Sequence, residues 1–166
     1  MIIRKADASD MPHLHHIAQA MATSHAVDYF AQCLQEQEQG KRIIFLALVD
    51  HVPIGYVQLN WKPLYAPFLR LDIPEIQDLN VIPSARQQGI GGRLIDHCEN
   101  LARASGKTDV GISVGVDSRF GAAQRLYVKK GYVPDGGGLS FDDVPVRVGE
   151  MRLIGDGLTL KLVKGL

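Results

Sequence analysis

The chain has 166 residues, of which 18 are basic and 18 acidic, so its formal net charge at pH 7 is zero. This balance argues against a dedicated nucleic-acid-binding protein, which usually carries a basic excess, although it leaves room for a local basic spot that receives a phosphorylated ligand. Hydrophobic residues make up 46% and charged residues 22%, as is typical of a soluble globular protein with its own core. We therefore expect a single domain over residues 1–166.

Cysteine content and the N-terminal residues indicate the compartment. Cys33 and Cys98 are too few for a disulfide framework, and neither belongs to a CxxC motif. The opening residues, MIIRKADASD, carry charges where a signal peptide needs an apolar core. No apolar run approaches the roughly 18 residues of a membrane-spanning helix. These features predict a cytoplasmic protein with no membrane partner.

Hydrophobic periodicity predicts four helices. The first has Ser9 or Asp10 as its N-cap, Pro12 in its first turn and apolar residues at i, i+3, i+4 and i+7 on one buried face. Gly131 closes the last helix, as glycine often does at a helix C-terminus. The predicted helices cover residues 10–21, 27–40, 92–104 and 121–130.

Seven short apolar or alternating stretches predict strands, and the second and third form an antiparallel hairpin. Between them lie two segments without a regular pattern, a proline-rich stretch at 62–74 with aromatics expected at the surface, and a glycine-rich connection at 135–157. The order of elements predicts an α/β (α+β) fold with a mixed sheet and helices on both faces. The predicted strands cover residues 1–6, 42–50, 54–61, 75–82, 109–116, 132–134 and 158–164.

Three glycines, Gly89, Gly91 and Gly92, stand at the start of the third predicted helix, although each lowers helix stability by up to about 1 kcal/mol. Backbone N–H groups at a helix N-terminus lack intrahelical partners, and a glycine loop lets an anion approach them closely. A phosphate or pyrophosphate is the simplest ligand, and a tight turn with nothing bound is the alternative. Neither the P-loop pattern GxxxxGK[ST] nor the dinucleotide pattern GxGxxG fits these residues.

The wider sequence resembles the GNAT superfamily of acetyl-CoA-dependent N-acetyltransferases. The segment LNVIPSARQQGIGGRLIDHCENLA carries that family's strand, [Q/R]xxGx[G/A] loop and helix, with Arg86, Gly89 and Gly91 at the signature positions. A second block, AAQRLYVKKGY, matches the family pattern AxxLYxKxG[F/Y] and places Ala123 and Tyr127 in it. The resemblance extends over nearly the whole chain and implies a GNAT-like, mostly antiparallel sheet of about seven strands.

The resemblance also implies acetyl-CoA as the cofactor. The pyrophosphate is expected on the glycine loop, and the pantetheine arm on the free backbone groups of a bulged fourth strand. Phe120 stands where the family often has an asparagine that helps to hold the cofactor, so Ser118 or Asp117 is the expected substitute. The bare face of GISVG at 111–115 fits either the space that the arm needs or a packed helix. The expected cofactor-binding residues are Leu79, Asn80, Val81, Arg86, Gln87, Gln88, Gly89, Ile90, Gly91, Gly92, Ser118 and Ala123.

Acetyl transfer to an amine needs an oxyanion donor, an acid for the departing thiolate and a means to deprotonate the amine. By resemblance the Val81 amide is the oxyanion donor and Tyr127 the acid. The base is left open between Glu75 and Asp78, which are three residues apart and face opposite sides of a regular strand. We favour Glu75 because its side leads toward the aromatic insert.

The acceptor is the least defined part of the site. His25, which is also a candidate base, borders the acceptor region by resemblance, and Trp61, Tyr65 and Phe68 are expected to contact the acceptor. A further histidine group lacks a carboxylate or cysteine to complete a metal site, so no metal is expected. This group consists of His13, His15 and His16.

Together these features predict an N-acetyltransferase that moves an acetyl group to a primary amine by direct attack in a ternary complex. The acceptor is a small molecule or a peptide, and a homodimer is left open. The alternatives are a non-catalytic acyl-CoA-binding sensor on the same fold and a phosphate-binding module unrelated to CoA. Tyr127 favours the enzyme over the sensor.

Overall fold

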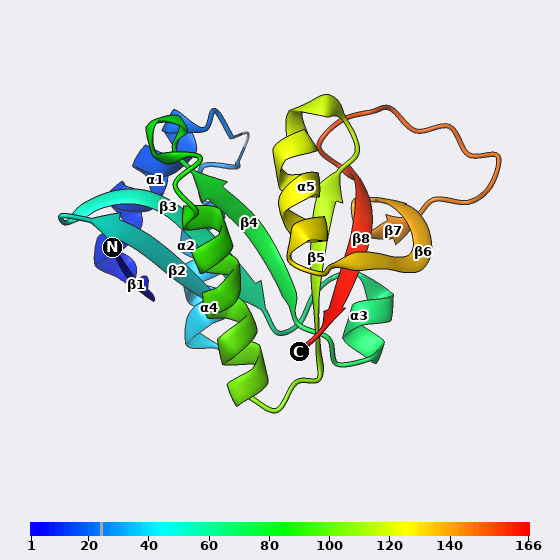
Figure 1. Cartoon of the computed structure of the whole chain (residues 1–166), viewed down its shortest axis with the longest axis horizontal. Coiled ribbons are helices and arrows are strands. Elements are labelled where there is room, and N and C mark those ends of the chain that lie inside the picture. The colour runs from blue at the N-terminus through cyan, green and yellow to red at the C-terminus, as the bar shows by residue number, and fades with distance from the viewer. Residues whose placement is uncertain (24) are drawn as a thin grey trace. The chain divides into compact units, whose positions relative to one another are not determined.

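The computed structural model describes residues 1–23 and 25–166 and divides into two compact units (Figure 1). The first unit comprises residues 1–61 and 76–101, and the second comprises residues 62–75 and 102–166. The described residues form eight strands, where the sequence predicts about seven. The described pairs are antiparallel, so the predicted mixed α/β fold with mostly antiparallel strands is confirmed.

The first unit is built on four strands in the order β1-β2-β3-β4. A two-residue turn at Asp50 and His51, both with positive φ (49° and 66°), joins the second and third strands into the predicted hairpin. Strand β4 starts at Glu75, in the second unit, and enters the first unit at Ile76. The four strands are β1 (Ile2–Lys5), β2 (Arg42–Val49), β3 (Val52–Asn60) and β4 (Glu75–Val81).

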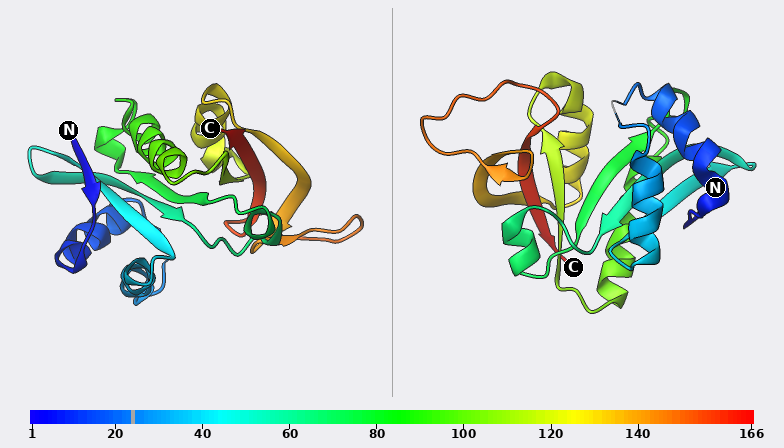
Figure 2. Two further views of the ribbon diagram at one scale, coloured as in Figure 1. Left: turned by 90° about the horizontal axis from the view of Figure 1, so that it is seen from below. Right: turned by 180° about the vertical axis from the view of Figure 1, so that it is seen from behind.

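Helices cover both faces of these strands. Helices α1 (Met11–Ala20) and α2 (Tyr29–Glu38) lie on one face, and α4 (Ile90–Ala104) lies on the other (Figure 2). On the α4 side, the ring of His97 packs edge to face on that of Phe45 from β2. Helix α4 begins two residues earlier than predicted, so Gly91 and Gly92 belong to its first turn.

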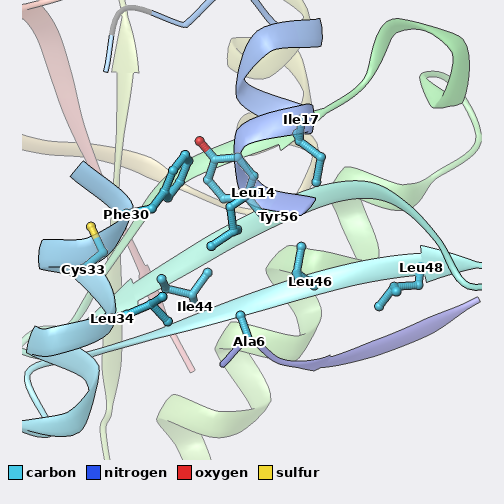
Figure 3. Packing of buried hydrophobic residues seen from close by; sticks show 10 residues of the cluster. All are labelled: Ala6, Leu14, Ile17, Phe30, Cys33, Leu34, Ile44, Leu46, Leu48 and Tyr56. Atoms are coloured by element: carbon cyan, nitrogen blue, oxygen red, sulfur yellow. The ribbon is translucent and has the colours of Figure 1, made fainter. Parts of the chain in front are cut away.

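The core of the first unit fills the space under α1 and α2 (Figure 3). Leu14, Ile17, Phe30 and Leu34 come from the helical faces that the periodicity predicts, whereas Val27 and Ala31, which the same pattern places on the buried face of the second helix, are exposed. The rings of Phe30 and Tyr56 meet edge to face at a centroid distance of 5.4 Å. The cluster consists of Ala6, Leu14, Ile17, Phe30, Cys33, Leu34, Ile44, Leu46, Leu48 and Tyr56.

The second unit has strands in the order β5-β8-β6-β7 and two helices. Pairs such as Ile112 with Leu162 and Val133 with Val163 set the register. Helix α5 lies along β5 (Figure 1). The elements are α3 (Ala66–Arg70), β5 (Asp109–Gly115), α5 (Gly121–Lys129), β6 (Val133–Phe141), β7 (Val144–Pro145) and β8 (Leu158–Gly165).

The bare face of β5 is covered by aromatic rings. A Cβ on Gly111 would clash with the ring of Phe68, and a Cβ on Gly115 would clash with the ring of Phe120. Of the two explanations for the small residues, the structure therefore favours a packed neighbour.

Two segments differ from the sequence expectation. The stretch at 62–74 contains the short helix α3, and its aromatics Tyr65 and Phe68 are 1% and 2% exposed, so the prediction that they lie at the surface is wrong. Strand β6 extends to Phe141 and pairs with β7, so only the later part of the expected long connection is irregular. Among the described residues, no helix is both long and apolar enough to cross a membrane.

Candidate functional site

The glycine loop leads directly into helix α4. Residues 86–89 are exposed, and the backbone takes positive φ at Gln87 (62°) and Gly89 (77°). A left-handed conformation suits glycine, which explains Gly89. Since the helix starts at Ile90, the N–H groups of its first turn have no intrahelical acceptor and are available to an anion. The loop therefore has the backbone geometry that phosphate binding needs.

Side chains tie this loop to the end of strand β4. Arg86 donates from Nε to the carbonyl of Val81 at 3.2 Å and lies within 3.2 Å of Met21 Sδ through Nη2. Gln88 donates from Nε2 to the carbonyl of Ser84 at 3.4 Å. These contacts anchor both side chains to backbone and sulfur within the first unit, although both remain exposed to solvent.

Strand β4 is distorted at Asp78, whose φ of 50° is unusual for a residue without a glycine's freedom. A left-handed residue within a strand interrupts the regular alternation of side chains, as a β-bulge does. Next to it, a Cβ on Gly55 of β3 would lie 2.6 Å from the carbonyl oxygen of Asn80, so only glycine allows this close approach. Leu79, Asn80 and Val81 follow the distortion and are half-buried.

The carboxylate of Asp78 is held on one oxygen only. Its Oδ2 accepts a hydrogen bond from the hydroxyl of Tyr29 and another from Gln58 Nε2 at 3.0 Å, and Gln58 also donates to the Tyr29 oxygen at 3.0 Å. Arg42 donates to Gln58 Oε1 at 2.7 Å and thereby fixes the orientation of the Gln58 amide. The other oxygen of Asp78, Oδ1, has no hydrogen-bond partner among the described residues, and the side chain is 25% exposed.

His25 lies beside this carboxylate. Its Nε2 is 3.1 Å from the hydroxyl of Tyr56 and 3.7 Å from Asp78 Oδ2, and its ring stacks on Tyr29 with centroids 4.1 Å apart. The Tyr56 oxygen also accepts a hydrogen bond from Asn80 Nδ2 at 3.0 Å. Burial and the nearby Asp78 carboxylate raise the pKa of the Tyr29 and Tyr56 phenols, so both stay protonated at neutral pH.

Glu75 lies in a separate polar cluster within the second unit. Its side chain is fully buried, and its Oε1 accepts hydrogen bonds from the hydroxyl of Ser113 and from Lys161 Nζ, the latter at 3.0 Å. Lys161 also donates to Ser113 Oγ at 2.7 Å and to Asp143 Oδ1. The ammonium therefore has an acceptor for each of its three hydrogens, and Glu75 is bound in a buried ion pair.

Tyr127 is buried on helix α5, where its ring lies 6.2 Å from that of Tyr132. Burial raises the pKa of its phenol, which therefore remains protonated at neutral pH. Ser118 is exposed, and Ala123 is half-buried. The neighbouring Asp117 is bound to the Arg119 guanidinium at 2.8 Å, which lowers the pKa of the carboxyl. Of the two substitutes for the missing asparagine, Ser118 is thus the less engaged.

The aromatic residues expected at the acceptor site have different positions. Trp61 is half-buried at the end of β3. Tyr65 donates to Asp135 Oδ2 at 2.8 Å and packs edge to face on Phe68, and both rings belong to the interior of the second unit. Burial and the Asp135 carboxylate raise the pKa of Tyr65 to about 12. Neither ring is on the surface where the sequence interpretation placed it.

The N-terminal histidines have local partners. His13 Nδ1 lies 3.1 Å from Asp10 Oδ1, and the ring of His15 meets Phe30 edge to face at 5.5 Å. In the part of the chain that the structure describes, no group of three histidine, cysteine or acidic residues is arranged to hold a metal ion.

Sequence reasoning missed the residues that hold the two carboxylates. Tyr29, Gln58 and Lys161 lie far from their partners in the chain, at sequence separations of 49, 20 and 86 residues. One signal was present for Gln58, which stands between Val57 and Leu59 in β3 and is buried, because a buried polar side chain needs a partner. Lys161 alternates with Leu160 and Leu162 in β8, a pattern that predicts a solvent-facing side chain, so no local pattern points to its burial.

The fold and the glycine loop first define the class, an α/β protein in which a glycine loop leads from a strand into a helix. Residues 11–132 match the model of the acetyltransferase (GNAT) family, so most of the chain is covered and the protein belongs to this family. Acetyl transfer is the activity of that family, and the protein is an acyltransferase. A search of curated proteins found no match.

Solved structures share the fold over the full length of the chain. A ribosomal-protein-alanine N-acetyltransferase from Brucella melitensis is 18% identical with a TM-score of 0.74, covering 100% of each chain. The protein yncA from Salmonella typhimurium, solved with its cofactor acetyl-CoA, is 19% identical with a TM-score of 0.71, covering 99% of this chain and 93% of that one. PaiA N-acetyltransferase from Thermoplasma acidophilum, in complex with coenzyme A, is 16% identical with a TM-score of 0.65, covering 99% and 98%.

Proposed function

We propose that the protein transfers an acetyl group from acetyl-CoA to the primary amine of a small molecule or peptide, by direct attack in a ternary complex. Family membership and structural relatives solved with acetyl-CoA or coenzyme A support the donor. The single observation that carries the acceptor side is Asp78, a partly exposed carboxylate on a distorted strand, with one oxygen held and the other without a hydrogen-bond partner among residues 1–23 and 25–166.

The glycine loop is the proposed binding site for the CoA pyrophosphate. The exposed loop and the free N–H groups at the start of α4 support this assignment, because they present several donors at the positive end of a helix dipole. Arg86 adds a positive charge close by. Leu79, Asn80 and Val81 supply the backbone groups for the pantetheine arm, and the Val81 amide is the proposed oxyanion donor.

Asp78, rather than Glu75, is the proposed carboxylate for the acceptor amine. The bound form of Glu75 supports this choice, because a fully buried carboxylate that pairs with Lys161 has neither access to an acceptor nor an unneutralised charge. Asp78 is accessible to an acceptor and keeps its negative charge, since Tyr29 and Gln58 contribute neutral hydrogen-bond donors only. The earlier preference for Glu75 assumed a regular strand, whereas the positive φ of Asp78 breaks the alternation on which it rested.

The proposed reaction begins with an ammonium group, because an alkyl amine with a pKa of about 10.4 is mostly protonated at neutral pH. Asp78 Oδ1 binds this cation and holds the nitrogen in place for attack. After deprotonation the nitrogen forms a bond to the thioester carbon, the C–S bond breaks, and CoA leaves as a thiolate. Tyr127, matching the family tyrosine, is the proposed group that donates to this sulfur, and its raised pKa keeps the necessary proton in place.

The solvent exposure of the candidate side chains decides which of them belong to the proposed acceptor site. Trp61 remains a candidate, whereas Tyr65 and Phe68 are excluded from the proposed site because both rings are buried. His25 lies next to Asp78 and belongs to the proposed acceptor region. These assignments favour an amine whose body carries no carboxylate near the nitrogen, because Asp78 would repel it.

Thiol release from acetyl-CoA in the presence of a panel of primary amines tests the activity. Turnover with at least one amine supports the proposal, and acetyl-CoA binding without turnover on any amine would favour the sensor. Replacing Gly91 by valine tests the loop, since a Cβ and two methyl groups would stand where the pyrophosphate approaches. We expect at least a tenfold weaker Kd for CoA from calorimetry with an unchanged circular dichroism spectrum. Equal affinity in a folded variant would show that the loop does not hold the pyrophosphate.

A further inference from the structure

We propose that His25 relays the acceptor proton to solvent, with Tyr56 setting its protonation state. The inference rests on the proposed function, because it concerns the amine that Asp78 binds. It is carried by the position of His25 Nε2, which lies 3.1 Å from the Tyr56 hydroxyl and 3.7 Å from Asp78 Oδ2.

Tyr56 determines which nitrogen of neutral His25 carries the proton. The Tyr56 oxygen already accepts a hydrogen bond from Asn80 Nδ2, and its own hydrogen needs an acceptor because Tyr56 is fully buried. The acceptor within reach is His25 Nε2. Neutral His25 therefore carries its proton on Nδ1, and its Nε2 accepts the Tyr56 hydrogen and is the nitrogen that can take up a further proton.

Asp78 stabilises the protonated state of His25. Once Nε2 is protonated, the imidazolium lies 3.7 Å from the carboxylate oxygen Oδ2, so the positive charge faces a negative one. The titratable groups that face His25 are Asp78 from β4, Tyr56 from β3 and Tyr29 from α2. His15 from α1 lines the same pocket, and Asp78 is the one carboxylate among these described neighbours. Both protonation states of His25 thus have a hydrogen-bond or ionic partner.

The position of His25 also provides an exit for the proton. Its side chain is 22% exposed, whereas Tyr56 behind it is fully buried. It also lines a surface pocket of about 260 Å³ together with His15, Ala26 and Phe30. The stacked ring of Tyr29 restricts the imidazole to one plane, so Nε2 stays directed toward the site while the ring keeps contact with solvent.

An imidazole is a better proton acceptor for an ammonium than a carboxylate is. The reference pKa is about 6.5 for a histidine imidazole and about 3.9 for an aspartate carboxyl, so the equilibrium constant for protonation is roughly 400-fold larger for the imidazole. We assign the first proton of the ammonium to His25 by way of the Tyr56 hydroxyl: one bridging water passes a proton to the Tyr56 oxygen while the hydroxyl gives its own hydrogen to His25 Nε2. The nitrogen loses its second proton as the C–N bond forms, and this proton balances the thiolate that leaves when the C–S bond breaks. The products are the amide, CoA as a thiol, and protonated His25, which returns its proton to solvent.

The test compares His25→Gln with His15→Gln, a matched control that lines the same pocket and whose ring packs edge to face on Phe30. With an amine that the wild type acetylates, we expect His25→Gln to lower kcat by about 10²-fold at pH 7. The loss should shrink as pH rises, because the amine then loses its proton without help. The control should stay within twofold of the wild type.

Two further measurements separate a relay from a structural role. Added imidazole should restore part of the activity of His25→Ala, since the vacated site can admit the free base. Tyr56→Phe keeps the ring and should show a pH-dependent loss of the same sense, which covers the case that His25 variants do not fold. A loss that is equal at all pH values and is not rescued, or a change in the amine KM alone, would overturn the relay. Failure of the wild type to acetylate any amine would instead refute the proposed function, and the relay with it.

Discussion

Replacing Lys161 by methionine removes the ammonium that binds two carboxylates, those of Glu75 and Asp143, in a largely buried cluster. The Lys161 side chain is 2% exposed, that of Glu75 is 0% exposed and that of Asp143 is 26% exposed. Removing one partner from a buried ion pair typically costs about 3–5 kcal/mol, because the other charge is left without compensation. For a chain of this length each kcal/mol lowers Tm by about 2–4 °C, so we expect Tm to fall by roughly 6–20 °C.

The assay is thermal unfolding followed by circular dichroism, with two further variants. Lys107→Met removes a lysine from a surface pair with Asp72, whose side chain is 67% exposed, and should barely change Tm. Adding Glu75→Gln to Lys161→Met neutralises the buried carboxylate and should recover part of the loss. A Tm for Lys161→Met within 2 °C of the wild type would refute the view that Glu75 serves this ion pair, and would return it to the list of candidate bases.

Two other predictions concern the proposed acid and the N-terminal region. Tyr127→Phe keeps the buried ring, so CoA affinity, measured by calorimetry, should stay unchanged. Its kcat, measured from initial rates, should fall by about 10²–10⁴-fold, as expected of a lost acid. An unchanged kcat would assign Tyr127 a packing role. Asp10 binds Arg4 at 2.6 and 2.7 Å, which lowers the pKa of its carboxyl. A carboxyl with a lowered folded-state pKa stabilises the fold above its unfolded value of about 3.9 and loses this contribution as pH falls. Urea unfolding should therefore show Asp10→Asn to be less stable than the wild type by about 1–3 kcal/mol at pH 7, with the gap closing toward pH 2; a gap independent of pH would contradict the assignment.

Much of the fold follows from local patterns in the sequence. Strands β2 and β3 are marked by apolar runs around a short turn, and helix α4 by a regular apolar stripe in which Leu94, Ile95 and Cys98 are fully buried. The glycine loop and the tyrosine block lie on the predicted strand-to-helix junction and helix. These features depend on neighbours within a few residues, so a single sequence contains what is needed to predict them.

The environment of the two carboxylates depends on contacts that a single sequence does not reveal. Glu75 meets Lys161 across 86 residues, and Asp78 turns away from the regular strand because its φ is positive. The burial of Phe68 depends on Gly111, whose missing side chain makes room for the ring. Helix α3 has five residues and begins at a proline-containing turn, too short for a periodic pattern. In each case tertiary packing determines the conformation or burial of the residue, and the local sequence pattern does not distinguish the alternatives.

The most direct test of the account is kcat/KM for an accepted amine in Asp78→Asn, measured from pH 6 to pH 9 beside Glu75→Gln. Asparagine keeps the shape of the side chain and removes the charge that binds the ammonium. The account predicts a loss of about 10²-fold at pH 6 to 7 that diminishes toward pH 9, with CoA affinity unchanged, while folded Glu75→Gln stays within a few fold of the wild type. Wild-type kcat/KM in Asp78→Asn, together with a large pH-dependent loss in Glu75→Gln, would contradict it.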